Sequence, residues 1–283
     1  MKYYLLLFAF FLAFVLVTPC VYGLLPSGLK PVTQKVTEEE YSVFYPETSE
    51  ENVGIDEKKV ACLLASVLDE DAPTEALKAA AIVLRTRLAS GDDDIRLSPY
   101  DVCAGYTNAA DATAGMVISC DGSLIDAAYH VSSYKMTESA LDGKGNDIPY
   151  LVSVTSPEDA ASSSKSYTAE EFRLFLGENG ISVDESISHR SWLTYVSRTA
   201  SGRIKRVFVG DTELSGTAFA ALFGFESTYI LIDTTEKGFV FTSAGSGDGV
   251  GLSLCGAVKM ANDGYSCDEI IKHYYKNVRI ERK

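Results

Sequence analysis

The chain has 283 residues, a formal net charge of −14 at pH 7 and 46% hydrophobic residues. This acidic balance argues against a nucleic-acid partner and against electrostatic adhesion to an anionic envelope, because both need basic surface. It is typical of an exported protein that an acidic, solvated surface keeps soluble.

The first 29 residues are predicted to form a transmembrane anchor. No charged residue occurs between Tyr3 and Leu29, and about 20 consecutive apolar residues suffice to cross a bilayer as a helix. A cleavable signal peptide usually has a shorter apolar core of about 7–15 residues, although Pro19 and the stretch to Gly23 leave cleavage open. Lys2 agrees with a cytoplasmic N-terminus. We therefore expect a single-pass protein of the cell membrane whose folded domain is extracytoplasmic.

Residues 30–54 are predicted to be a linker, because prolines and an acidic run leave little periodicity there. Residues 55–283 are predicted to form the folded domain, which opens with two helices. Asp56 is placed to cap the first helix. Thr74 is placed to cap the second, which runs from Glu75 to about Leu88.

The rest of the domain combines strands and helices. Asp121-Gly122 is a strong hairpin turn signal, and Thr168 with Glu171 forms a capping box. Strands are predicted at 115–120, 123–130, 191–199, 203–209, 229–233 and 238–242, and further helices from 168, at 217–223, 250–262 and 267–275. The fold class is therefore α+β, with helices at both ends of a strand-rich middle.

Six cysteines lie at positions 20, 62, 103, 120, 255 and 267. No pair has the spacing of a zinc knuckle or of a CxxC redox motif. Free thiols that behave as small apolar residues are the favoured interpretation, and a single disulfide, for example between Cys255 and Cys267, stays open.

Three stretches carry a family resemblance. They are EALKAAAIVLRTR at 75–87, AYHVSSYKMTES at 128–139 followed by PYLVSV at 149–154, and 247–275, which begins GDGVGLSLCGA and ends DEIIKHYY. In the same order they resemble the EALKAQAxxARTY helix, the SxGGxTE and PYLxSV segments, and the GHGVGMSQxGA ending of the SpoIID/LytB family. The resemblance covers roughly residues 55–280 and implies a SpoIID-like domain behind the N-terminal anchor.

The resemblance implies chemistry on peptidoglycan, because family members are lytic transglycosylases of sporulation or related amidase enhancers. In a transglycosylase a carboxyl group protonates the leaving glycosidic oxygen, and the sugar's own hydroxyl closes an anhydro ring. The family's acid stands eleven positions before the Lys of the EALK motif. Counting back from Lys78 gives Val67, which cannot donate a proton. Glu70 serves only if the helix end is re-spaced, and otherwise belongs to a solvated acidic turn.

Two further acids complete the catalytic candidates. Glu138 keeps the Glu of the SxGGxTE motif, and Asp248 replaces the His of GHGVG. The substrate-binding candidates are Arg85, His130, Thr137 and Ser253. For His130 a packed strand-end histidine is the alternative interpretation. The surviving glycines of the last motif are expected to specify backbone shape more than chemistry.

No metal or other cofactor is predicted. Some family members bind zinc through a His and two Cys, and only Cys103 remains as a match. Leu97 and Ala109 stand where further ligands are expected, and a tight zinc site usually needs at least three protein ligands.

Three functions follow. The first is a SpoIID-like sporulation or cell-wall protein that binds peptidoglycan glycan strands, with catalysis impaired at Val67. The second is an active lytic transglycosylase with a relocated acid, Glu70 or Asp248. The third is an exported adaptor for another envelope hydrolase of the engulfment machinery.

Overall fold

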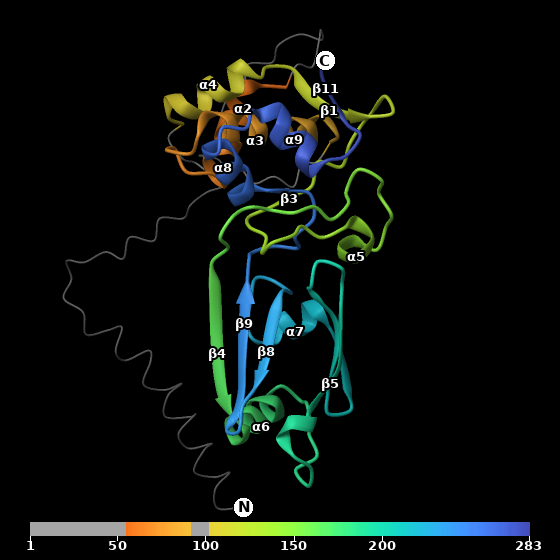
Figure 1. Cartoon of the computed structure of the whole chain (residues 1–283). Coiled ribbons are helices and arrows are strands. Elements are labelled where there is room, and N and C mark those ends of the chain that lie inside the picture. The colour runs from red at the N-terminus through yellow and green to blue at the C-terminus, as the bar shows by residue number, and fades with distance from the viewer. Residues whose placement is uncertain (1–54, 92–101) are drawn as a thin grey trace, which may run out of the picture. The chain divides into compact units, whose positions relative to one another are not determined.

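The computed structural model describes residues 55–91 and 102–283, which form a mixed α+β fold (Figure 1). The fold class therefore agrees with the sequence-based prediction. The predicted anchor at 1–29 and the linker at 30–54 lie outside the described residues. Within the described part of the chain, no helix is long and apolar enough to cross a membrane.

A first hydrophobic core surrounds α3 (Thr74–Ala89), whose small residues Ala76, Ala79, Ala80 and Ala81 are buried. Small side chains let neighbouring backbones approach, and helices contact α3 from several sides. These are α2 (Glu57–Val67), α4 (Ala104–Ala112), α8 (Leu254–Asn262) and α9 (Cys267–Tyr274). Helices from both ends of the chain therefore build one core, as Figure 1 shows.

The helix caps agree in part with the sequence. Asp56 caps α2 as predicted, because its side chain accepts a hydrogen bond from the backbone N–H of Lys58 at 2.9 Å. Thr74, in contrast, is the first helical residue of α3, and Pro73 holds the cap position without a side-chain bond.

Short strands flank the first core. β1 (Met116–Cys120) pairs with β2 (Ser123–Leu124) and with the C-terminal β11 (Arg279–Arg282), all antiparallel. Asp121 and Gly122 both have positive φ, as the predicted hairpin turn requires. The strand expected at 123–130 is divided, and its second part, β3 (Tyr129–His130), pairs in parallel with β10 (Leu252–Ser253).

A second core is rich in phenylalanine and contains Phe172, Phe219, Phe223, Phe239 and Phe241. One sheet has the order β4 (Ser162–Thr168), β9 (Gly238–Ala244), β8 (Ile230–Thr234), and the other contains β5 (Leu193–Arg198), β6 (Ile204–Val209) and β7 (Thr212–Ser215). The helices α6 (Ala169–Glu178) and α7 (Gly216–Leu222) belong to this core, and α5 (Ala140–Lys144) and the short η2 (His189–Ser191) complete the elements. The capping box of Thr168 and Glu171 forms as predicted.

The chain returns from β9 to α8 through a glycine-rich loop. Gly247, Gly249 and Gly251 have φ of +98°, +83° and +78°, a region that residues with a side chain rarely adopt. The helix expected from Val250 therefore begins later, at Leu254. The loop leads the chain into β10 and places the N-terminus of α8 beside the turn that follows α2 (Figure 1).

Candidate functional site

A cleft of about 1080 Å³ opens at the C-terminal end of α2. Its wall consists of the end of α2, the acidic turn before α3, Tyr106 of α4, Val131, the pair Glu158-Asp159 and residues of α8 from Leu254 to Asn262. The volume slightly exceeds the range of about 300–1,000 Å³ typical of small-molecule sites. Elements far apart in the sequence thus meet around one opening.

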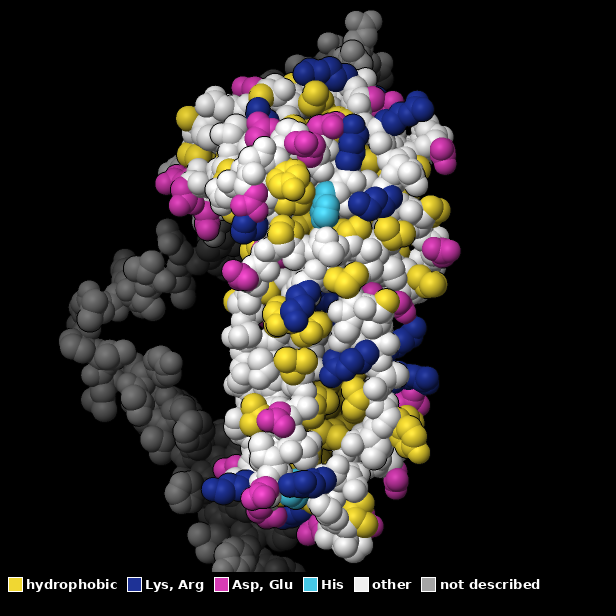
Figure 2. Space-filling model, in the orientation of Figure 1, with side chains coloured by type: hydrophobic (Ala, Val, Ile, Leu, Met, Phe, Trp, Pro, Cys, Tyr) yellow, Lys and Arg dark blue, Asp and Glu magenta, His cyan; other side chains and the backbone are white. Residues whose placement is uncertain are grey.

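Val67 lies in this wall, half-buried, with Leu68 beside it. Asp69, Glu70 and Asp71 follow as an exposed turn, and Glu70 lines the cleft. In Figure 2 acidic side chains gather at the left edge of the helical part, where Figure 1 places the turn between α2 and α3. The rim of the cleft is therefore acidic next to the aliphatic side chain of Val67.

Glu158 is a buried acid in the cleft wall, with 8% of its surface exposed. Its Oε1 accepts hydrogen bonds from the Ser133 backbone N–H at 2.7 Å and from the Ser253 hydroxyl at 2.5 Å. Its Oε2 is also buried but has no hydrogen-bond partner. Leaving a buried polar atom unpaired costs about 1–3 kcal/mol or more, so such an atom calls for an explanation.

The start of α8 supports this carboxyl group. Ser253 caps the helix, since its Oγ accepts from the Gly256 backbone N–H at 3.2 Å while donating to Glu158. A side chain at Gly256 would overlap the Tyr274 hydroxyl and lie 2.8 Å from the Glu158 Oε2. The absence of a Cβ thus leaves room for the unpaired oxygen.

His130 extends the network inside the protein. Its Nδ1 lies 3.2 Å from the Val250 carbonyl, and its Nε2 lies 2.6 Å from the Ser133 hydroxyl. A neutral ring satisfies both contacts, because Nδ1–H donates to the carbonyl while Nε2 accepts from Ser133. Burial, helped by the nearby charge of Arg203, lowers the pKa of His130 to about 4, although the Val250 contact, Asp248 and Glu158 act in the opposite direction.

Acidification is expected to destabilise the protein through His130. The unfolded state, with an ordinary pKa near 6.5, binds the proton before the folded state does, so stability is full above about pH 6.5 and falls towards about pH 4. At about 1.4 kcal/mol per pKa unit the loss approaches about 3 kcal/mol. Urea unfolding across this window measures it. His130→Gln should flatten the slope relative to the wild type, and equal slopes in both proteins would refute the prediction.

The chain is similar to sporulation proteins of Bacillus. It is 29% identical to stage II sporulation protein D of Bacillus amyloliquefaciens and of Bacillus subtilis, over 62% of this chain and 50% of each relative. It is 23% identical to the amidase enhancer of Bacillus subtilis, over 73% of this chain and 38% of the relative. These similarities support the SpoIID/LytB resemblance of the sequence. No family model matches the chain, and the match spans about half the length of the SpoIID relatives.

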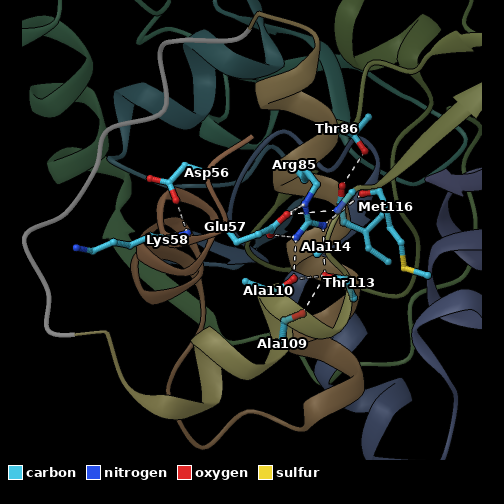
Figure 3. Close-up of polar contacts among 12 residues, drawn as sticks. Asp56, Glu57, Lys58, Arg85, Thr86, Ala109, Ala110, Thr113, Ala114 and Met116 are labelled. Carbon is cyan, nitrogen blue, oxygen red and sulfur yellow. Dashed lines mark hydrogen bonds and ion pairs between the residues drawn. The ribbon is translucent and has the colours of Figure 1, made fainter. Parts of the chain in front are cut away.

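Arg85, the arginine of the SpoIID/LytB helix motif, does not line the cleft. It is 1% exposed and pairs with Glu57 at the opposite end of α2, with its Nε 3.0 Å from the Glu57 carboxylate (Figure 3). It also donates to the Ala110 carbonyl at 3.0 Å and to Thr113 and the Met116 carbonyl at 3.3 Å. The structure therefore does not bring Arg85, a predicted substrate-binding residue, into the wall of this cleft, because these contacts lie inside the protein.

Glu138 and Thr137 are also buried away from the cleft wall. Glu138 is 2% exposed, and its Oε2 accepts from Thr199 at 2.6 Å and from Ser201 at 2.7 Å. Thr137 accepts from the Val154 backbone N–H at 2.9 Å. Both side chains connect segments of the fold, so the geometry does not place them with Val67 and Glu70.

Asp248 is exposed and accepts from the Val250 backbone N–H at 2.9 Å, again outside the cleft wall. Of the seven predicted site residues, only Glu70 lines the cleft, while Ser253 and His130 lie behind it in the network of Glu158.

The cysteines that the structure describes are free, so Cys255 and Cys267 form no disulfide. Cys255 is exposed at the start of α8 and lines the cleft, and burial raises the pKa of its thiol. In the described ranges no three His, Cys, Asp or Glu side chains gather closely enough to hold a metal ion.

Sequence reasoning missed Glu158. It lies in an irregular segment just beyond the PYLVSV stretch, in which no periodicity indicates a buried face. The one sequence signal is that an acid stands four positions after the end of the PYLVSV stretch, and this alone does not indicate that its side chain is buried.

Proposed function

We propose that the chain is a sporulation- or cell-wall-related protein that binds peptidoglycan glycan strands in the cleft beside Val67. The names of its relatives, stage II sporulation protein D and amidase enhancer, support the general role. The carrying observation is that the end of α2, where the family's acid position falls on Val67, and α8, which lies in the last family motif, line one open cleft. The apolar segment at 1–29 supports a position outside the membrane.

The lining suits a sugar polymer. Aliphatic side chains such as Val67, Val131 and Val258 offer contact to the C–H faces of pyranose rings. Carboxylates such as Glu70 and Asp159 accept hydrogen bonds from hydroxyl groups and donate none. Such a mixture of apolar wall and a few polar groups is what a specific ligand site requires.

Retention of the full-length chain on purified peptidoglycan sacculi tests this function. Val131 is 52% exposed in the cleft, so Val131→Asp should fold normally and weaken retention by about tenfold, or about 1.4 kcal/mol. Leu231 is 49% exposed on β8, outside the cleft, and Leu231→Asp is the matched control that should bind as the wild type does. No retention of the wild type, or equal retention of the two variants, would contradict the proposal.

An adaptor function is the second candidate, favoured by the relative named amidase enhancer. Tyr195 is 82% exposed at an irregularity of β5, where its φ is +48°. An exposed aromatic residue in a strained backbone is typical of a contact site for another protein. This candidate would be supported if the wild-type chain does not bind sacculi but stimulates a cell-wall amidase. The stimulation should then be lost in Tyr195→Ala.

A further inference from the structure

Lys135 stands in a strained turn at the surface of the protein. Its φ is +66°, and the backbone N–H of Met136 donates to the Tyr134 carbonyl at 2.8 Å across it. A hydrogen bond between residues two positions apart, around a residue with this φ, marks a γ-turn of the rare and strained type. Tyr134 and Lys135 occupy the positions of the two glycines in the SxGGxTE motif, where a glycine would avoid the strain. Strained backbone is concentrated at functional sites, which makes Lys135 a candidate for a role in binding.

The turn presents a cation beside two tyrosines. The Lys135 side chain is exposed, and its ammonium lies 5.0 Å from the centre of the Tyr134 ring, which in turn lies 4.6 Å from the centre of the Tyr229 ring. A second exposed cation, Arg198, donates to two backbone carbonyls, one of which belongs to Ile230, the residue after Tyr229. Neither cation forms an ion pair with a residue that the structure describes. Both are therefore open to an anionic ligand.

This cationic surface lies within reach of the cleft. Val131, which lines the cleft, stands four residues before Lys135, so their Cα atoms are at most about 14 Å apart. The cleft itself is acidic, since five of its lining residues are Asp or Glu. Of the described residues that line it, only Lys259 is basic, and it pairs with Asp263. A ligand carboxylate is therefore repelled by the cleft and attracted to Lys135.

We infer that Lys135 binds a carboxylate of a peptide attached to the glycan strand, so that this chain recognises peptide-bearing peptidoglycan. The inference rests on the proposed function, since the glycan strand itself lies in the cleft. The peptides of peptidoglycan branch from its muramic acid residues and carry free carboxylates, and a branch of about four residues spans about 13 Å when extended. This length suits the separation of Val131 and Lys135. The ammonium group donates to the carboxylate, Arg198 supplies a second cation, and the two tyrosines offer apolar surface to the peptide.

Retention of the full-length chain on two kinds of sacculi tests the inference. Both kinds are freed of phosphate polymers, and one is then stripped of its peptides by a cell-wall amidase. The wild type should bind the peptide-bearing sacculi about tenfold more tightly, the size of a hydrogen bond to a charged group. Lys135→Gln should lose this preference, because the carboxylate has lost its cation, whereas Lys135→Arg should keep it. Lys237→Gln is the matched control, since Lys237 is also exposed but lies between β8 and β9, and it should bind as the wild type does.

The results separate the inference from the proposed function. If the wild type binds both kinds of sacculi equally, the inference is wrong and glycan binding stands. If it binds neither kind, the proposed function fails and the inference fails with it. A preference that survives in Lys135→Gln also overturns the inference. Val131→Asp, in contrast, should weaken retention on both kinds, because it acts on the cleft itself. If Lys135→Gln folds poorly, Lys135→Gly replaces it, because glycine suits the positive φ, and a preference retained in this variant refutes the role of Lys135.

Discussion

Replacing Arg85 with methionine is expected to lower the free energy of unfolding by about 3 kcal/mol, the lower end of the range for breaking a buried ion pair. The substitution leaves Glu57 without its cation and deprives the Ala110 and Met116 carbonyls of a donor. The lower end applies because the Glu57 side chain is 24% exposed, so water compensates part of the loss. Urea unfolding measures the change.

Arg206→Met is the matched control for this prediction. Arg206 also pairs with a glutamate, Glu213, at 3.1 Å, but its side chain is 63% exposed. Exposed pairs contribute about 0–1 kcal/mol, so this variant should unfold almost as the wild type does. A different result would contradict the prediction: the free energy of unfolding of Arg85→Met stays within about 1 kcal/mol of the wild-type value, but the variant loses sacculus binding. Arg85 would then have the substrate-binding role that the family resemblance implies.

The local features of the fold could be predicted because their causes are local. The Asp56 cap, the capping box at Thr168 and the turn at Asp121-Gly122 each depend on residues a few positions apart. β4, in contrast, was not predicted, because six of its seven residues are exposed and no alternation of apolar and polar residues marks it. Pairing with β9 alone makes it a strand.

The candidate site could be predicted only in part, because the direction and burial of its side chains depend on tertiary contacts. Counting positions in the family motif identified Val67, which does line the cleft. The direction of Arg85 and the burial of Glu138 depend on tertiary contacts with Glu57 and Ser201, which no motif encodes. Glu158 becomes recognisable only when the packing of α8 against its segment leaves one oxygen unpaired.

The largest expected loss of stability comes from Gly251→Ala, in the loop that leads to β10. A side chain at φ +78° costs about 1–2 kcal/mol, and here its Cβ would also overlap the carbonyl oxygen of Ala128. That oxygen accepts from Leu252 at 3.0 Å and from the Tyr275 hydroxyl at 2.6 Å, so it cannot retreat without breaking both bonds. Overpacking of this kind adds about 1–3 kcal/mol, for a total near 4 kcal/mol.

Gly180→Ala isolates the clash from the backbone strain. Gly180 has nearly the same φ, +75°, but nothing lies within 4 Å of its added Cβ. Thermal and urea unfolding of both variants should therefore differ by about 2 kcal/mol, the overpacking contribution alone. If both lose the same stability, the Ala128 carbonyl is not a fixed obstacle. In that case the approach of β3 and β10, which holds Ser253 against Glu158, does not depend on a glycine at this position.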